Sequence, residues 1–203
     1  MKLYYMPGAC SFADHIVLEW IGKPYEAKRL SHDELKAPAY LKLNPNGAVP
    51  VLEDGDFVLT QNAAILNYLA DLNPQSGLGG DGTPKSRAEI NRWLSFLNAD
   101  VHPTFHPLFG STAYLEDNAA VKKTKGAART KLRSLFERAD AQLAGRDWLT
   151  GTRSIADPYL YVVQRWARSM GVDLSGFDNL AKFVARIEAD ASVQKVLKEE
   201  GLS

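Results

Sequence analysis

The chain has 203 residues and carries 24 basic and 24 acidic side chains, so its formal net charge is zero. This length allows one or two domains with a substantial core, and 45% hydrophobic and 24% charged residues are ordinary for a globular protein. Zero net charge gives no electrostatic reason to expect a nucleic acid or an anionic membrane as partner. The single cysteine excludes an intramolecular disulfide and an all-cysteine metal site.

The first residues do not resemble a secretory signal, because the charged Lys2 is followed directly by a strand pattern and a Pro7-Gly8 turn. No apolar run approaches the roughly 20 residues that span a bilayer. We therefore expect a soluble, cytoplasmic protein without a nucleic-acid or membrane partner.

The first 76 residues alternate between strand and helix signals. Strands are expected over 3–6, 25–30, 49–52 and 57–59, and helices over 11–20, 38–43 and 62–72. The acidic segment 53–56 contains a glycine and predicts a hairpin turn between the last two strands. This order is typical of a small α/β domain.

Segment 77–83 is rich in glycine and is expected to be a linker. Strand signals stop after it, and apolar residues then recur at helical spacing. Helices are expected over 84–101, around 132–143, over 155–170 and in two short segments near the end. Residues 155–170 are apolar on nearly all sides, which predicts a buried central helix in an all-α domain spanning 84–203.

Cys10 lies where the first expected strand passes into the first helix. The unpaired N–H groups and the dipole of a helix start favour negative charge. A thiol there can have its pKa lowered, or it can hold another thiolate nearby. Free cysteines are as often buried and inert, so the local sequence leaves both interpretations open.

Val49-Pro50 stands at the start of a strand, where a proline cannot donate a ladder hydrogen bond. A trans peptide is the common form. A cis peptide would instead turn the Val49 backbone toward an extended peptide ligand. The N–H and C=O groups of Val49 would then pair with that ligand as with an added strand.

Asn62 stands at the start of the third expected helix, where it is a plausible N-cap. The alternative is an anion site, in which Gln61, Asn62 and the helix-start N–H groups receive an amino-acid carboxylate. Ser154 and Asp157 form a capping-box pattern before the apolar helix, which we interpret as a folding signal.

His102 and His106 are four residues apart and could suggest a metal pair. Pro103 and Pro107 argue against one regular helix carrying both, and no third ligand is evident, so we expect no metal. A cleft histidine that donates a hydrogen bond is the preferred interpretation.

Taken together, these segments resemble the glutathione transferase family. Five stretches resemble its bacterial beta class: Met1–Ser11, Asn44–Pro50, Ala64–Ala70, Ser154–Asp157 and Glu200–Leu202. The resemblance implies a thioredoxin-like α/β domain over 1–76 that binds glutathione as co-substrate. It also implies an all-α domain over 84–203 that forms the pocket for a hydrophobic electrophile. A homodimer is expected, with helix 84–101 supplying much of the interface.

The resemblance also implies roles for residues of the glutathione site. Cys10 would face the glutathione sulfur and be able to form a mixed disulfide with it, Ser11 would donate a hydrogen bond to that sulfur, and His102 would lie near it. Val49, before Pro50, would pair with the cysteinyl unit. Gln61 and Asn62 would hold the γ-glutamyl end.

For the electrophile pocket, Trp166 matches an aromatic residue in the cleft between the domains, and Tyr5 and His106 are further candidates. The chain also departs from the beta-class pattern. Segment 31–37 looks shorter, which leaves His32 and Lys36 as candidates for binding the glycine carboxylate.

Two more departures bear on chemistry. Ser95 stands where an asparagine is expected, and Ala13 stands where a dithiol enzyme would need a second cysteine. The function expected first is conjugation of glutathione to electrophiles. The alternatives are a monothiol glutathione-dependent reductase of disulfides or peroxides, acting through a Cys10 mixed disulfide, and a non-enzymatic binding or regulatory protein of the same fold.

Overall fold

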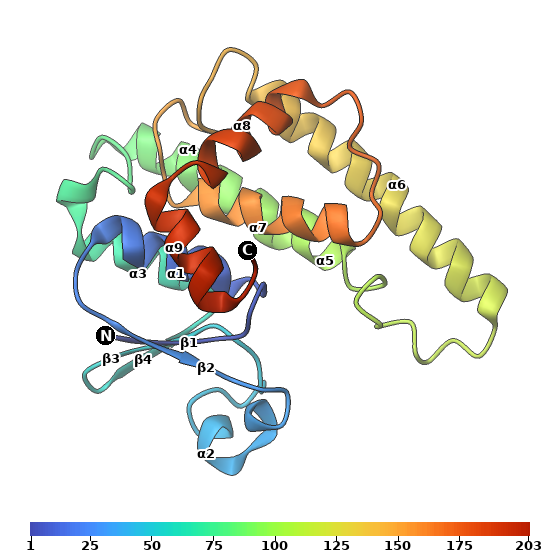
Figure 1. Ribbon diagram of the computed structural model, residues 1–203, viewed down its shortest axis with the longest axis horizontal. Helices are drawn as coiled ribbons and strands as arrows, with labels where there is room; N and C mark the ends of the chain where they lie inside the picture. The colour runs from blue at the N-terminus through green and yellow to red at the C-terminus, as the bar shows by residue number, and fades with distance from the viewer.

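The computed structural model describes residues 1–203, and a four-stranded mixed sheet organises its N-terminal part (Figure 1). The strands are β1 (Lys2–Tyr5), β2 (Glu26–Arg29), β3 (Val51–Asp54) and β4 (Phe57–Thr60), in the order β2-β1-β3-β4. β1 and β2 are parallel, whereas the β1–β3 and β3–β4 pairs are antiparallel. The predicted α/β order of elements is confirmed.

Helices lie on both sides of this sheet. α1 (Ser11–Ile21) and α3 (Asn62–Leu72) lie on the side that faces the rest of the molecule, and the short α2 (Pro38–Leu41) lies on the other (Figure 1). α1 ends because Gly22 adopts a left-handed conformation, with φ of 72°, and donates its N–H to the Leu18 carbonyl. Short 3-10 turns cover Glu34–Lys36 and Pro74–Ser76.

The rest of the chain is helical, as predicted. It comprises α4 (Pro84–Ser95), a π-helical segment (Phe96–Val101), α5 (His102–Thr104), α6 (Asn118–Gln142), α7 (Ala156–Ser169), α8 (Asp178–Glu188) and α9 (Ala191–Glu200). The helix expected over 84–101 is therefore α4 continued by the wider π-helical turn. α7 is the buried central helix that its apolar sequence predicts.

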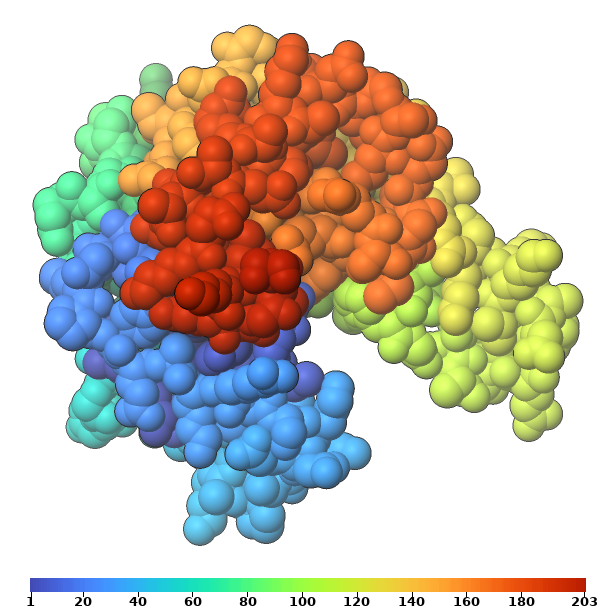
Figure 2. All heavy atoms as spheres, in the orientation of Figure 1, coloured from blue at the N-terminus to red at the C-terminus, as the bar shows by residue number.

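α6 begins well before the predicted residue 132, and its polar first half projects away from the body of the molecule (Figure 1). Its buried residues are confined to the later part, Ala128–Ala139, so hydrophobic spacing could not reveal the exposed half. Figure 2 shows an open recess between this projecting arm and the N-terminal part. No helix in the molecule combines the length and the apolar composition needed to cross a membrane.

The two parts share one hydrophobic core. A single cluster of 44 buried residues runs from the sheet through α1 into the helical part. α1 lies at the centre of this packing, because it contacts β1 and α3 of the N-terminal part as well as α7 and α9 of the helical part. The first helix is thereby held rigidly between the sheet and the helical part.

The capping box before α7 is formed. Asp157 is completely buried and accepts hydrogen bonds from the Ser154 N–H at 2.7 Å, the Ser154 hydroxyl at 2.9 Å and the Leu149 N–H at 2.9 Å. The Ser154 hydroxyl accepts in turn from the Ala156 N–H at 3.3 Å. The pattern therefore acts as the folding signal that the sequence predicts.

Replacing Asp157 by alanine should destabilise the protein by roughly 3 kcal/mol, because it leaves several buried donors without an acceptor. Asp117 is a matched control: it caps α6 by accepting the Ala119 N–H at 2.7 Å but is exposed. Asp117→Ala should cost about 1 kcal/mol or less. Urea unfolding measures both, and equal losses would contradict this account of the buried box.

Candidate functional site

A cavity of about 140 Å³ opens between the N-terminal part and the helical part. It is built from four stretches of chain: the start of α1, the loop before β3, the junction of β4 and α3, and side chains of the helical part. Its lining residues are Cys10, Asn44, Asn46, Ala48, Val49, Pro50, Gln61, Asn62, Asn98, His102 and Tyr159. We call this cavity the Cys10 pocket.

The turn before Cys10 is held by the helical part of the chain. Gly8, with φ of 70°, donates its N–H to Glu200 Oε2 at 2.9 Å and accepts Trp166 Nε1–H on its carbonyl at 2.7 Å. Glu200 is 2% exposed, and its other oxygen lies 2.9 Å from His15 Nδ1. The position of Cys10 therefore depends on α7 and α9 as well as on its own strand and helix.

The Cys10 thiol is half-buried and lies with Sγ 3.6 Å from the Val49 carbonyl oxygen. Burial, with a further contribution from the nearby Asp14 carboxyl, raises the pKa of the Cys10 thiol to about 12. The sequence left open whether the pKa of this thiol is lowered, and the enclosure of the helix start raises it instead. Desolvation outweighs the favourable field of the helix start, and Cys10 is a protonated donor.

The Val49–Pro50 peptide is cis, as the functional interpretation of the sequence proposed. The Val49 N–H makes no hydrogen bond within the protein, while its carbonyl faces the Cys10 thiol. The preceding loop is fixed at Ala48, whose carbonyl accepts from Asn44 Nδ2 at 2.7 Å and the Tyr40 hydroxyl at 2.8 Å. An extended ligand backbone can therefore pair with Val49 without disturbing the protein.

The start of α3 differs from the predicted cap. Gln61 occupies the N-cap position with φ of 76°, a conformation that is uncommon for a residue other than glycine, and Asn62 is the first helical residue. The first helical hydrogen bond is from Ile65 N–H to the Gln61 carbonyl at 3.0 Å, so the N–H groups of 62–64 precede the ladder. Since no side chain caps them, they are available to an anion.

His102 forms the helical wall of the pocket. Its Nδ1 lies 2.7 Å from the Tyr159 hydroxyl, which also lies 3.2 Å from Asn98 Oδ1. Burial, with a smaller contribution from His106, lowers the pKa of His102 to about 4, so its ring is neutral near pH 7. The His106 ring is 5.9 Å away and does not line the pocket. No group of three or more His, Cys, Asp or Glu side chains is arranged to hold a metal ion.

Trp166 lies at the edge of this wall. Its ring centroid is 4.7 Å from that of His102, 5.6 Å from Phe105 and 5.2 Å from Phe109. Phe109 is 44% exposed, so the aromatic cluster presents an open apolar face beside the pocket.

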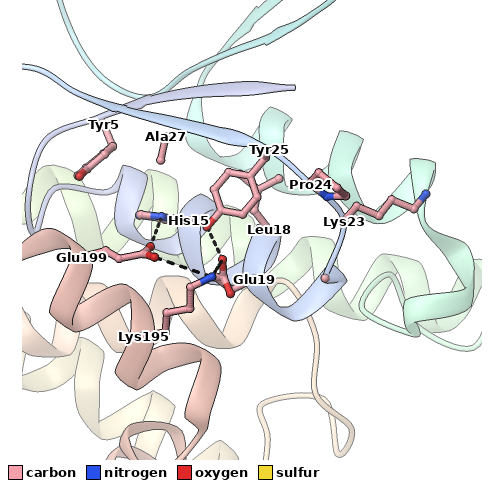
Figure 3. A pocket seen from close by; sticks show the side chains of 11 residues that line it. Tyr5, His15, Leu18, Glu19, Lys23, Pro24, Tyr25, Ala27, Lys195 and Glu199 are labelled. Atoms are coloured by element: carbon pink, nitrogen blue, oxygen red, sulfur yellow. Dashed lines mark hydrogen bonds and ion pairs between the residues drawn. The ribbon is translucent and has the colours of Figure 1, made fainter.

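The structure does not bring Ser11 and Tyr5 into the Cys10 pocket. Ser11 is fully buried, with its hydroxyl 3.3 and 3.4 Å from the backbone nitrogen and oxygen of Met6, so it is not free to reach a ligand sulfur. The Tyr5 side chain packs against His15 instead, with the two ring centroids 5.1 Å apart. It lines a separate and larger cavity of about 600 Å³ between α1, β2 and α9 (Figure 3).

His32 and Lys36 are exposed on the segment before α2, and neither lines the pocket. Ser95 is also exposed and outside it, whereas Asn98, which the sequence analysis missed, lies in the lining. A signal was available, because Asn98 precedes His102 by one helical turn and shares its face. Tyr159, on the apolar central helix, carried no comparable signal.

Comparisons with known proteins agree with this fold. Residues 1–71 match the model of the glutathione S-transferase N-terminal domain, and residues 97–191 match that of the C-terminal domain. Glutathione S-transferase GST-4.5 of Xanthomonas campestris is 58% identical, with all of both chains covered. Glutathione S-transferase GstA of Escherichia coli is 34% identical, again over all of both chains.

Solved structures give the same result. A glutathione S-transferase from Xylella fastidiosa is 56% identical with a TM-score of 0.97, covering 100% of this chain and 99% of that one. A sphingomonad glutathione S-transferase complexed with glutathione is 37% identical with a TM-score of 0.88, covering all of both chains. The chain belongs to the glutathione S-transferase family. It is a glutathione transferase, an enzyme whose co-substrate is glutathione.

The raised pKa of Cys10 predicts slow alkylation in the unliganded enzyme. At pH 7.5 iodoacetamide should modify Cys10 at least about tenfold more slowly than it modifies free glutathione, because little of the protein thiol is ionised. Mass spectrometry of the intact protein follows the reaction, and Cys10→Ala is the control that must gain no mass. Alkylation as fast as that of glutathione would contradict the assigned protonation state.

Proposed function

We propose that glutathione binds in the Cys10 pocket with its sulfur beside the Cys10 thiol and its cysteinyl backbone against Val49. The observation that carries this proposal is the convergence of three kinds of binding group in one cavity. These are the Cys10 thiol, the free Val49 N–H and the uncapped N–H groups at the start of α3. They suit the sulfur, the extended backbone and the γ-glutamyl carboxylate respectively.

Cys10 would act by donating a hydrogen bond to the glutathione thiolate. A thiol with a pKa of about 12 is a poor nucleophile near neutral pH but a competent donor to an anion. The glutathione thiol loses its proton to solvent, the thiolate attacks an electrophilic carbon, and the leaving group departs with the bonding electrons. His102, neutral and beside Tyr159, would position the reactants without titrating between pH 5 and 8.

The electrophile would lie against Trp166 and the exposed Phe109, which pack on the fully buried Phe105. Trp166 adjoins His102, and Phe109 leaves an apolar face exposed beside it. A hydrophobic, preferably aromatic, substrate fits this surface. His106, exposed next to His102, would lie at its margin.

For the glycine carboxylate we retain His32 and Lys36 as candidates. Both lie on the exposed segment before α2, outside the pocket lining, so they would bind only the outer end of the tripeptide. Removal of either is expected to weaken binding modestly, because an exposed ion pair contributes little.

We also propose that the enzyme belongs to the beta class and is cytoplasmic. A bacterial beta-class glutathione S-transferase of Sphingomonas chungbukensis is 35% identical over all of both chains, with a TM-score of 0.88. The beta-class stretch around Cys10 supports the same assignment. A lone free thiol fits a reducing compartment. The division into a glutathione-binding domain over 1–76, a linker over 77–83 and a helical domain over 84–203 follows the change from sheet to helices.

The wild-type protein should accelerate conjugation of glutathione to a chlorodinitrobenzene, and Cys10→Ala should retain measurable turnover. Losing one hydrogen bond to a thiolate should lower kcat/KM by about tenfold to a hundredfold. The exposed Ser95→Ala is a control that should change it less than about twofold.

The same variants distinguish the alternative function. Reduction of a glutathione mixed disulfide through Cys10 should be absent in Cys10→Ala, whatever its rate in the wild type. Complete loss of conjugation in Cys10→Ala, with folded protein and saturating glutathione, would contradict the donor role. Absence of any conjugation by the wild type would overturn the proposed site.

A homodimer is proposed through the edge strand β4 and α4. Phe57 and Val58 on β4 are 46% and 37% exposed, an apolar edge that a monomer would leave in water. Light scattering should give twice the 22.4 kDa chain mass. Phe57→Glu should shift the population toward the monomer, whereas Tyr114→Glu, at a 79% exposed residue in the turn before α6, should not. A monomeric wild type would contradict this assembly.

A further inference from the structure

Asp14 is a completely buried acidic residue that has no role in the site described so far. It lies on α1 one turn after Cys10, so the two side chains share a helix face. An unpaired carboxyl in such a place is costly, and buried polar groups are normally held by hydrogen bonds. A partner for Asp14 is therefore expected inside the protein.

That partner is Asn62. The Asn62 side chain is 3% exposed, and its amide satisfies its surroundings in one orientation, with Nδ2 donating to Asp14 Oδ2 at 2.8 Å and to the Cys10 carbonyl at 3.1 Å. The reverse orientation would place the amide oxygen against two acceptors. The Asn62 amide therefore connects the start of α3 to two points on the first turns of α1.

These two helix starts carry opposite ends of the proposed glutathione site. α1 presents the Cys10 thiol, and α3 presents Gln61 and the uncapped N–H groups that suit a carboxylate. Glutathione must contact both at once, so the spacing of the two helix starts decides how well it binds. Since Asn62 is held on one side by Asp14, the buried acid controls this spacing from behind the pocket.

We propose that Asp14 is a positioning residue of the glutathione site: through Asn62 it fixes the start of α3 against the start of α1. This inference rests on the proposed binding of glutathione in the Cys10 pocket. Asp14 does not touch the ligand. The positioning requires only the side-chain oxygen of Asp14 as a hydrogen-bond acceptor, which an asparagine at this position would also provide.

The charge of Asp14 has a separate effect. Burial, with a smaller contribution from Glu200, raises the pKa of the Asp14 carboxyl well above its ordinary range, and this carboxyl in turn contributes to the raised pKa of Cys10. Replacing the acid by its amide keeps the acceptor and removes the charge. The two effects can therefore be measured apart.

The test compares Asp14→Asn, Asp14→Ala, Asn62→Ala and the double alanine variant. Asp14→Ala should raise the KM for glutathione about tenfold, the effect of one lost hydrogen bond, and Asn62→Ala, which loses two, should raise it at least as much, with the KM for the electrophile unchanged. Asp14→Asn should stay within about twofold of the wild type. The double variant should be no worse than Asn62→Ala alone, because that variant already removes the link to Asp14.

A second readout does not involve glutathione. At a pH high enough to ionise the Asp14 carboxyl, Cys10 should be alkylated faster in Asp14→Asn than in the wild type, because the variant lacks that negative neighbour. If the wild type itself shows no glutathione binding by calorimetry, the proposed site fails, and the alkylation result still reports on the contact between Asp14 and Cys10.

Two results would overturn the inference. The first is a glutathione KM in Asp14→Ala or Asn62→Ala equal to that of the wild type. The second is full additivity in the double variant, which would show that the residues act independently. If Asp14→Ala does not fold, Asp14→Asn and Asn62→Ala decide: the inference requires that the first preserve the KM and the second raise it.

Discussion

The site depends on two hydrogen bonds through which the helical part holds the turn between β1 and α1. Gly8 is hydrogen-bonded through its N–H to Glu200 on α9 and through its carbonyl to Trp166 on α7. The turn that presents Cys10 is therefore placed by residues that lie 192 and 158 positions away, and His15 beside Glu200 extends the link into α1. The sheet supplies the strand, but the helical part decides where the thiol lies.

The protonation of Cys10 follows from that enclosure. The start of a helix exposed to water would favour a thiolate. The start of α1, however, is buried between the N-terminal part and the helical part, where desolvation raises the pKa of the Cys10 thiol to about 12. A cysteine in this state is suited to stabilising another thiolate rather than to forming bonds itself. The same burial keeps His102 neutral, so the pocket offers glutathione hydrogen bonds and no fixed positive side chain.

Much of the fold could be predicted, because glycine and proline mark the ends of its elements and apolar spacing marks the helices. The buried α7 was predicted on that basis, whereas for Val49–Pro50 the sequence left the common trans form and the observed cis form both open. The direction of individual side chains was harder to predict than the order of the elements. Tyr5 and Ser11 are close to Cys10 in sequence but point elsewhere, and a cap at Asn62 was wrong because Gln61 takes the left-handed turn. Tyr159 meets the site only through tertiary packing, which single-sequence patterns do not encode, whereas Asn98 and Asp14 lie one helical turn from His102 and Cys10 and share their helix faces.

The central claim is that the catalytic thiolate belongs to glutathione and that Cys10 stays protonated beside it. A pH titration of the ultraviolet absorbance of thiolate, with and without bound glutathione, tests this directly. The account predicts no thiolate signal from the free enzyme at neutral pH and one upon glutathione binding, with an apparent pKa below that of glutathione in solution. It also predicts that a weaker signal remains in Cys10→Ala. A thiolate in the free enzyme near neutral pH that disappears in Cys10→Ala would contradict it.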